Sequence, residues 1–349
     1  MKKRLSLALA VVMALSMVLS ACGNQNQPNA SGSSSTGSAG GDKPSGPVSI
    51  SFGTASVGGN YYVLGAGIAA IWNEKIPEYV SVTPEATGGS GANVGLVQNG
   101  DCQVAMTVDN TAYNGYNGLS WANGQKYDSI RTMFAMMPSA LEMVATKSSG
   151  ITSIDQFKDA TVCIGPATSG GNLAFAEILS VLPELAYKNK VDLSWSDCVT
   201  QMSDGLVDLM IDYGTFPHSA RTELVTNNEC VWINLSDEQI KKVCDAYPYY
   251  YEGSEPAGTY KYMDEEYPSI LCNNIMFCSK DLDEETVYQM VKCTFENLDE
   301  WALSSSAVDY VNAEAITSCS VPLHPGAIRY FEEIGIQIPE NLYPPEYKG

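Results

Sequence analysis

Positive charge is scarce in this sequence, and its scarcity excludes a large class of partners. The 349 residues contain 19 Lys and Arg against 40 Asp and Glu, which gives a formal net charge of −21 at pH 7. Proteins that bind nucleic acid neutralise phosphates with clustered Lys and Arg. Beyond residue 47 the only arginines are Arg131, Arg221 and Arg329. We therefore expect no nucleic-acid partner.

Several motifs of catalysis and cofactor binding are also missing. The sequence has no GxxxxGK[ST] phosphate loop, no HExxH zinc motif and no Asp-rich calcium loop. The segment GAGIAA, residues 65–70, fits GxGxxA, but it lies inside an expected helix and not at the helix start. We interpret Gly65 and Gly67 as positions where that helix packs closely. No cofactor and no metal are expected.

A serine hydrolase is a weak alternative. Ser90 and Ser169 lie in glycine-rich turns, but neither turn matches GxSxG. The two histidines, His218 and His324, lie beside prolines, and neither sequence context shows a base held by an acid. We therefore expect a protein that is not an enzyme.

The N-terminus reads as an export signal. Residues 1–4 are Met-Lys-Lys-Arg, sixteen largely apolar residues follow, and the run ends in Leu-Ser-Ala-Cys at Cys22. This pattern predicts a signal peptide over residues 1–21. Leu-Ser-Ala-Cys resembles a bacterial lipobox, which implies an extracytoplasmic protein anchored to the cell membrane through lipidated Cys22. An ordinary secreted protein is the alternative. Residues 22–47 are rich in Gly and Ser and predict a flexible linker.

The cysteines do not suggest a disulfide framework. Nine remain beyond Cys22, an odd number, and no CxxC pair occurs among them. Cys163 and Cys293 have apolar neighbours, so we interpret such sites as small buried hydrophobic residues. A disulfide such as Cys272 to Cys278 stays open.

The chain repeats one pattern three times: a β-branched strand, a glycine-rich turn and an apolar segment of helical period. The turns are ASVGGN, TGGSGAN and ATSGGN, residues 55–60, 87–93 and 167–172. Strands that alternate with helices predict an α/β fold with mainly parallel sheets. Capping boxes are expected at Ser153 with Gln156 and at Ser236 with Gln239. One long amphipathic helix is expected over residues 281–303.

Glycine-rich turns at helix starts favour the binding of an anion. The first helical turn has unpaired N–H groups and the positive end of the helix dipole, and glycine lets a ligand approach the backbone. One such turn is weak evidence. Three turns at the carboxyl ends of strands indicate a shared crevice.

At this point the sequence resembles a known family. Six segments occur in the order found in TAXI proteins, the solute receptors of one branch of the tripartite ATP-independent periplasmic (TRAP) transporters. They are FGTASVGGNYY, ATGGSGANVGLVQNGDCQVAM, SIDQFKDATVCIGPATSGGN, MSDGLVDLMIDYGTFP, PAGTY and VPLHPGAIRYFEE. The resemblance runs from about Val48 to Gly335. It implies a type II periplasmic-binding-protein-like fold with two lobes, each a mainly parallel sheet flanked by helices.

The segment SALEMVATKSSGITS, residues 139–153, indicates a crossing between two lobes, after which the strand–turn–helix pattern starts again. Lobe 1 is expected over residues 48–139 plus 261–349, and lobe 2 over residues 140–260. The resemblance implies ligand contacts as well. The residues expected to contact the ligand are Gly59, Asn60, Tyr61, Ser90, Asn93, Thr168 and Ser169, with Asn110, Tyr213 and Phe216 as further walls of the site. The family often reads closer to GAP where this chain has YGTFP, a difference in the part that sets specificity. The C-terminal segment from Ile336 lies outside the motifs and is expected to be a surface tail.

The function implied is capture of a small carboxylate, glutamate or a related acid, between the lobes. The partners implied are this anionic solute and the membrane permease of a TRAP transporter. A lipoprotein that serves an ATP-driven (ABC) importer is the alternative. A purely structural or adhesive lipoprotein would have no closing cleft.

Overall fold

The computed structural model describes residues 46–348. The expected signal peptide, lipidated Cys22 and nearly all of the expected linker lie outside the described residues. The described part falls within one compact unit. Within it, no helix is long and apolar enough to span a bilayer.

The described chain alternates strands and helices. The strands are β1 (Val48–Gly53), β2 (Val80–Glu85), β3 (Val104–Val108), β4 (Ile130–Thr146), β5 (Thr161–Cys163), β6 (Asn189–Val191), β7 (Leu209–Thr215), β8 (Cys230–Trp232), β9 (Tyr251–Glu255) and β10 (Tyr267–Ser279). The α-helices are α1 (Asn60–Lys75), α2 (Ser90–Asn99), α3 (Asp109–Asn117), α4 (Gly170–Val181), α5 (Trp195–Ser203), α6 (Ser219–Asn227), α7 (Asp237–Ala246), α8 (Glu284–Glu296), α9 (Leu298–Ala302) and α10 (Pro325–Glu333). Short 3₁₀ turns are η1 (Ser120–Ala122), η2 (Lys147–Ser149), η3 (Ile154–Asp159), η4 (Pro183–Leu185), η5 (Ser306–Tyr310), η6 (Ala313–Ser318) and η7 (Glu340–Leu342).

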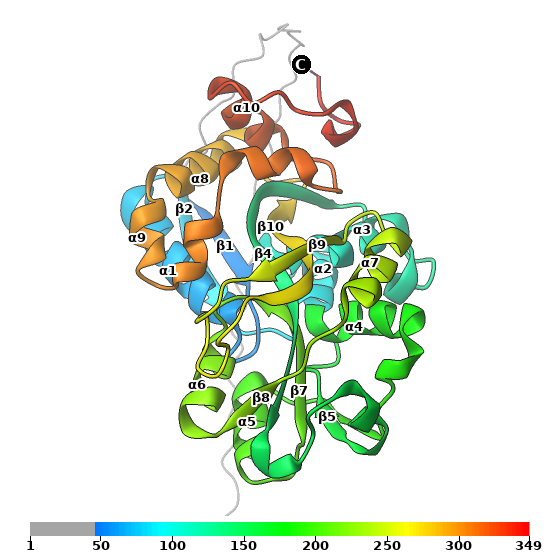
Figure 1. The fold of residues 1–349 in the computed structure, drawn as a ribbon. Coiled ribbons are helices and arrows are strands. Elements are labelled where there is room, and N and C mark those ends of the chain that lie inside the picture. Colours follow the sequence, from blue (N-terminus) through cyan, green and yellow to red (C-terminus); the bar gives the residue numbers. More distant parts are fainter. Residues whose placement is uncertain (1–45, 349) are drawn as a thin grey trace, which may run out of the picture. The chain divides into compact units, whose positions relative to one another are not determined.

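The strands form one connected sheet, whose main path runs in the order β2-β1-β3-β10-β4-β7-β5-β6, while β8 pairs with β4 and β9 pairs with β10 (Figure 1). Its two ends are parallel: β1 pairs with β2 and β3, and β5 pairs with β6 and β7. Its middle is antiparallel, because β10 pairs with β3 and β4, and β4 pairs with β7. Helices flank both ends. The predicted α/β pattern is confirmed, with the long antiparallel strands as an addition.

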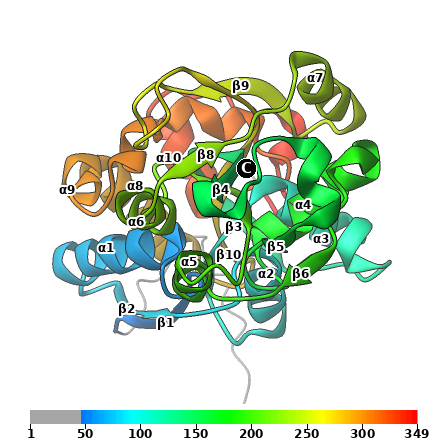
Figure 2. The same ribbon diagram turned by 60° about the horizontal axis from the view of Figure 1, so that its bottom comes forward.

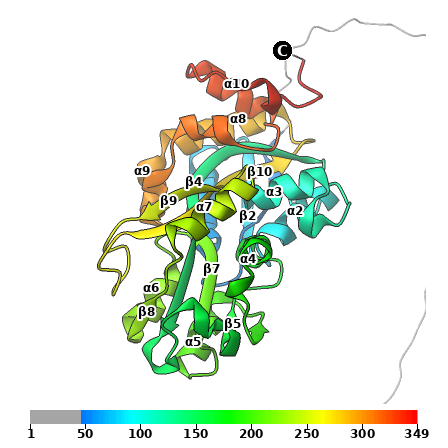
Figure 3. The ribbon, with the colours of Figure 1, turned by 45° about the vertical axis from the view of Figure 1, so that its right-hand side comes forward.

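Strand β4 runs unbroken through the region where a crossing between lobes was expected. All but one of its residues are buried, as its nearly continuous apolar sequence requires of a strand covered on both faces. Pro138 is accommodated because it pairs with Asn273 at a register shift between β4 and β10. Figure 3 shows β4 continuing beside β7 below the helices α2 and α3.

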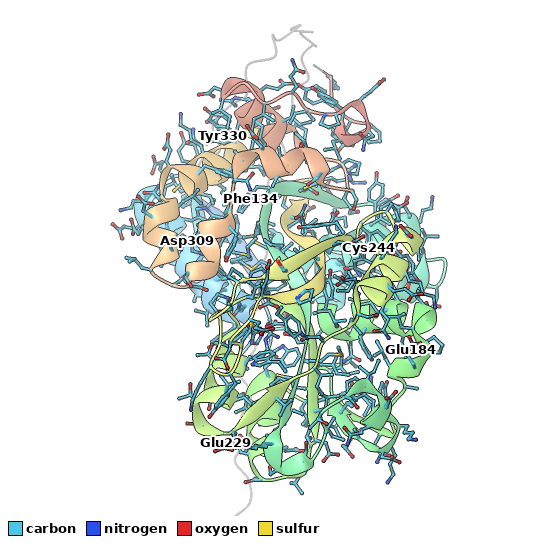
Figure 4. The ribbon with its side chains drawn as sticks, in the orientation of Figure 1. Phe134, Glu184, Glu229, Cys244, Asp309 and Tyr330 are labelled. Carbon is cyan, nitrogen blue, oxygen red and sulfur yellow. The ribbon has the colours of Figure 1, made fainter. Side chains whose placement is uncertain are left out.

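Buried hydrophobic residues form three clusters on this sheet. The largest includes Trp72, Phe134 and Trp301, and all its buried members fall in residues 48–139 or 261–349. Phe134 and Tyr330 are labelled in Figure 4, and Phe295 packs between their rings at centroid distances of 5.7 Å to each. The other two clusters draw mainly on residues 140–260.

The C-terminal segment is not a surface tail, and this expectation is wrong. Leu342 is fully buried in the largest cluster, and its carbonyl accepts a hydrogen bond from the Leu323 amide at 2.8 Å. Arg131 binds Glu346, with Nε 2.7 Å from Oε1. The expected long helix is also divided: α8 ends at Glu296 and α9 starts at Leu298.

Smaller predictions are confirmed. Both capping boxes are present, at Ser153 with Gln156 and at Ser236 with Gln239. All nine cysteines of the described chain are free thiols, and all but Cys244 are buried.

Candidate functional site

A cavity lies where three helix starts meet the carboxyl ends of two strands. The helices are α1, α2 and α4, and the strands are β3 and β7. The empty volume is about 400 Å³, including the space that is open to solvent. In Figure 2 the start of α1 lies beside α5, and Trp195 of α5 lines the cavity. The lining residues are Ala55, Gly59, Asn60, Tyr61, Gly89, Ser90, Val108, Ser139, Ser169, Gly170, Gly171, Trp195, Asp212, Tyr213, Gly214, Thr215 and His218.

The glycines of α2 and α4 allow these two helix starts to touch. Gly89 has a φ of +93°, a conformation that side chains rarely adopt. A Cβ on Gly170 would lie 2.7 Å from both Ser90 Oγ and the Val108 side chain. The Gly91 amide also donates to the Thr168 carbonyl at 2.9 Å. The glycine-rich sequence is therefore needed for contact between the turns.

The start of α1 is bonded to the loop after β7. Asn60 Nδ2 donates to the carbonyls of Thr215 at 3.2 Å and Pro217 at 2.8 Å, and the Ser219 amide donates to Asn60 Oδ1 at 3.1 Å. Ser219 Oγ donates to the Gly58 carbonyl at 2.8 Å. These bonds join the residues expected in lobe 1 to those expected in lobe 2, so this conformation is closed at that edge.

Six of the predicted ligand contacts line the cavity. They are Gly59, Asn60, Tyr61, Ser90, Ser169 and Tyr213. Ser90 Oγ accepts a hydrogen bond from the Val108 amide at 3.2 Å, and Ser169 caps α4 by accepting from the Asn172 amide at 3.1 Å. Tyr61 donates to Asn274 Oδ1, and that same oxygen accepts from Ser139 Oγ at 3.0 Å.

Four predicted contacts do not line the cavity. Asn93 is fully buried, and its Nδ2 donates to the carbonyls of Met106 and Thr54, which ties the first strands together. Asn110 Nδ2 donates to Tyr250 and Glu177 at 3.0 and 3.2 Å. The remaining two are Thr168, which bonds the Gly88 carbonyl, and Phe216, whose ring packs on Tyr310.

Sequence reading missed Asp212, His218, Trp195, Ser139 and Thr215, all of which line the cavity. Asp212 follows three apolar residues in β7 and is 2% exposed. An acid inside an apolar strand is a usable signal, because buried carboxylates are rare unless they have a partner or a function. The other four carry no comparable sequence signal.

Asp212 belongs to a buried cluster of charged groups. Arg221 is fully buried and forms ion pairs with Asp212 and Glu142. Burial raises the pKa of Asp212 to about 7, and it raises the pKa of Glu255, which faces Arg221, to about 8. Burial lowers the pKa of His218 to about 3, so this imidazole is neutral at pH 7. One guanidinium therefore faces several carboxyl groups in a region of low dielectric.

The position of His218 corrects one expectation without creating a hydrolase site. Its Nε2 lies 3.7 Å from Asp212 Oδ2, so an acid does lie beside this histidine. However, Nδ1 accepts a hydrogen bond from the Ala220 amide at 3.2 Å. Neither ring nitrogen is bonded to a serine hydroxyl, and Ser90 is bonded to backbone instead. Within the described residues, the cavity has no serine hydroxyl hydrogen-bonded to a histidine base, the arrangement that acyl transfer by a serine hydrolase requires.

Comparison with known proteins is consistent with this geometry. Residues 52–335 match the model of the NMT1-like family. Among solved structures, MatC from Rhodopseudomonas palustris with bound malate is similar at a TM-score of 0.53 and 12% identity, covering 83% of this chain and 97% of that one. The periplasmic binding protein BugD is similar at a TM-score of 0.52 and 14% identity, covering 85% of this chain and 100% of that one. These two similarities show that the fold is the α/β fold of periplasmic binding proteins.

A third structure is more distant. The binding protein component of an ABC phosphonate transporter from Pseudomonas aeruginosa is similar at a TM-score of 0.46 and 11% identity, covering 76% of this chain and 80% of that one.

Proposed function

The chain belongs to the NMT1-like family, and from this premise and the binding-protein fold we propose that it is an extracytoplasmic solute receptor. It captures a small carboxylate in the cavity and delivers the solute to a membrane transporter. The observation that carries the proposal is the meeting of three helix starts around one cavity. Each helix start carries the positive end of a helix dipole, and three such ends around one cavity favour an anionic group.

The carboxylate is held by neutral groups. Among residues 46–348, no Lys or Arg lines the cavity, whereas Ser90, Ser169 and the backbone of Gly170 do. Hydroxyl and backbone N–H groups suit a carboxylate at a helix start without a cationic side chain. The proposed role is binding without catalysis. It is supported by His218, whose ring nitrogens are not bonded to a serine hydroxyl.

Binding is coupled to closure of two lobes, residues 48–139 plus 261–349 and residues 140–260. This division is supported by the hydrophobic clusters, since the largest draws its buried members from the first set. Hydrogen bonds such as that of Asn60 with Pro217 close the edge of the cavity. A ligand that touches both lobes shifts the population toward the closed form by no more than its differential affinity.

Two classes of membrane transporter are candidates for the partner. The ordered motifs resemble those of TRAP receptors. The similar proteins named above favour an ATP-driven importer, because they include a component of an ABC transporter and their names mention no TRAP transporter. Glutamate as cargo rests on the motif resemblance alone. Co-purification of the full chain with an ATPase or with an ion-coupled permease separates the two partners.

Attachment to the membrane through Cys22 belongs to the same proposal. Export with lipidation places the cavity outside the cytoplasm and near the transporter. Mass spectrometry of the mature N-terminus tests it: a diacylated Cys22 is expected, and an unmodified N-terminus would favour an ordinary secreted protein.

Thermal unfolding of residues 46–349 with a panel of amino acids, dicarboxylates, 2-oxo acids and sugars tests the receptor role. A ligand at a hundred times its dissociation constant should add about 2.7 kcal/mol to the free energy of unfolding. We expect this shift with a carboxylate and not with neutral sugars. Ser90→Asp should abolish it, because a second negative charge would face the ligand. No shift with any compound, before or after unfolding and refolding to release a trapped ligand, would overturn the receptor proposal.

A further inference from the structure

A second cavity, here called the tyrosine cavity, lies in a part of the chain that the proposed function does not use. The segment YPYYY, residues 247–251, contributes Tyr249, Tyr250 and Tyr251 to its lining, and α3 contributes Asp109 and Tyr113. Residues of β10, of the segment 315–320 and of η7 complete the lining. The empty volume is about 1190 Å³, including the space that is open to solvent, and no lining residue is shared with the cavity at the three helix starts.

We propose that the tyrosine cavity is a second binding site, and that it takes an organic cation, an ammonium group that carries alkyl groups in place of hydrogens. The Asp109 carboxylate supplies the opposite charge, and the tyrosine rings contact the alkyl groups. Tyrosine rings attract such cations because the faces of the rings carry partial negative charge. The proposal does not depend on which solute the first cavity captures.

Asp109 is a buried carboxyl group without a cation beside it. The residue is 3% exposed, and its Oδ1 accepts a hydrogen bond from the Ser320 amide at 3.3 Å. Burial raises the pKa of Asp109 to about 6, although the residue lies in the first turn of α3, where the helix dipole favours negative charge. Among residues 46–348, no Lys, Arg or His contributes to this pKa. At pH 7.5 the carboxyl is therefore ionised, and its charge is unbalanced in a region of low dielectric.

The surroundings of Asp109 add negative charge. Within the described residues, no Lys, Arg or His lines the tyrosine cavity. The pKa of the Cys272 thiol is raised by burial and also by the charges of Asp109 and Glu177. Glu177 is 5% exposed, and its carboxylate accepts hydrogen bonds from neutral groups, among them the Tyr250 hydroxyl at 2.8 Å. A cation is therefore favoured here and an anion is not, because burying further charge of the same sign is costly.

The tyrosines have the exposure and the mutual angles of an aromatic cage. Tyr251 is 40% exposed, and Tyr113 and Tyr249 are half-buried. The ring of Tyr249 is inclined at 54° to that of Tyr113 and at 81° to that of Tyr250, with centroid distances of 5.6 and 4.8 Å. Inclined rings can contact one ammonium group together, whereas stacked rings cover each other's faces. The Tyr251 hydroxyl donates to Asn273 Oδ1 at 3.1 Å, which orients that ring.

This set of groups suits an alkylated ammonium better than a metal ion. Metal ions in proteins are held by several oxygen, nitrogen or sulfur ligands. Within residues 46–348, no group of three or more His, Cys, Asp and Glu is placed to hold one. One carboxylate beside several aromatic rings is instead the arrangement that binds alkylated ammonium groups.

The test compares choline with 3,3-dimethylbutan-1-ol, in which a neutral carbon replaces the ammonium nitrogen. Each compound is titrated by calorimetry against residues 46–349 at pH 7.5. We expect choline to bind at least about tenfold more tightly, because only choline balances the buried charge. Asp109→Asn should remove this difference by weakening choline alone. Asp309→Asn is the matched control, because it removes the same charge from an exposed position in η5, and it should leave both affinities unchanged.

A second variant decides the question if Asp109→Asn does not fold. Tyr251→Leu removes a ring that is 40% exposed, so the fold should be retained. Its affinity for choline should fall about two- to fivefold, the size of effect of one cation–π contact at an exposed site.

Three results would overturn the proposal. The first is no binding of choline, and the second is equal affinity for choline and the neutral alcohol. The third is unchanged choline affinity in Asp109→Asn or, where that variant does not fold, in Tyr251→Leu, because choline would then bind elsewhere. The receptor role of the first cavity is judged by its own panel of compounds, so each proposal can fail without the other.

Discussion

At the scale of single residues, the site depends on positions that have no side chain. Gly170 is required because any Cβ there would meet Ser90 and Val108 at 2.7 Å. Asn93 shows the opposite relation: it was expected to contact the ligand, but its Nδ2 donates to the carbonyls of Thr54 and Met106, and its Oδ1 accepts from Thr87 Oγ1 at 2.7 Å. A polar residue of a glycine-rich turn can thus hold strands together, while a glycine allows the close contact beside the cavity.

Gly170→Ala tests the need for close contact between the turns. The added methyl group should push α4 away from α2, lowering the free energy of unfolding by about 1–3 kcal/mol and ligand affinity by at least tenfold. Gly95→Ala is the control, since nothing lies within 4 Å of its Cβ. This second variant should be stabilised by up to about 1 kcal/mol and should bind normally. Chemical denaturation with and without ligand measures both, and equal behaviour of the two variants would contradict the prediction.

At the scale of elements, helix ends and strand pairing follow local chemistry where the chemistry is strong. Both capping boxes form as their sequences predict. The division of the last long helix at Asn297 was missed, because the apolar period continues across it. Asn297 Nδ2 donates locally to the Cys293 carbonyl of α8 at 2.7 Å. Trp301 Nε1 donates to the Leu64 carbonyl of α1 at 2.9 Å, a long-range contact that the local sequence pattern does not contain.

The C-terminal segment from Ile336 is a second such element, because it packs on the largest hydrophobic cluster. Leu342→Ala should lower the free energy of unfolding by about 2–5 kcal/mol, because Leu342 is fully buried. Leu303→Ala is the matched control: Leu303 is 87% exposed, and its removal should change stability by no more than about 0.5 kcal/mol. Urea denaturation measures both variants. Similar stability of the two would restore the surface-tail expectation.

At the scale of the whole molecule, the buried charged cluster makes stability depend on pH. The folded-state pKa values of Asp212 and Glu255 are raised to about 7 and about 8 by burial. The folded chain therefore keeps protons that the unfolded chain releases, and the free energy of unfolding falls as pH rises toward these values. Near pH 6.5 His218 offsets part of this fall, because its imidazole is neutral in the folded chain and half protonated in the unfolded chain. Above about pH 7.5 it is neutral in both states and has no effect.

We expect the free energy of unfolding to fall between pH 6.5 and 8, by up to about 1.4 kcal/mol per pH unit for each titrating group. Denaturation at fixed ionic strength measures it. Glu255→Gln should flatten the fall near pH 8, since the neutral amide cannot titrate. A stability that is constant or rises over this interval would refute the assignment of these two raised pKa values.

Features that depend on residues close together in the sequence were mostly predicted correctly, whereas features that depend on distant residues were mostly not. The glycine-rich turns, the capping boxes and the α/β pattern were predicted because each depends on neighbours along the chain. The close packing at Gly65 and Gly67 was predicted from their position in a helix, but its partners were not. In the structure a Cβ on Gly65 would lie 2.4 Å from the Thr54 side chain, and one on Gly67 would lie 2.8 Å from Ser304.

The sequence by itself determined the alternation of strands and helices and the glycine-rich turns at three helix starts, because periodicity and turn chemistry are local. Only the tertiary structure decided which side chains meet in the cavity. Asp212, Ser139 and His218 reach it from different elements, whereas Asn93 and Asn110 are directed to other partners. The reason is that β4 and β10 pair over a long range, and this pairing fixes the distance between segments far apart in the chain.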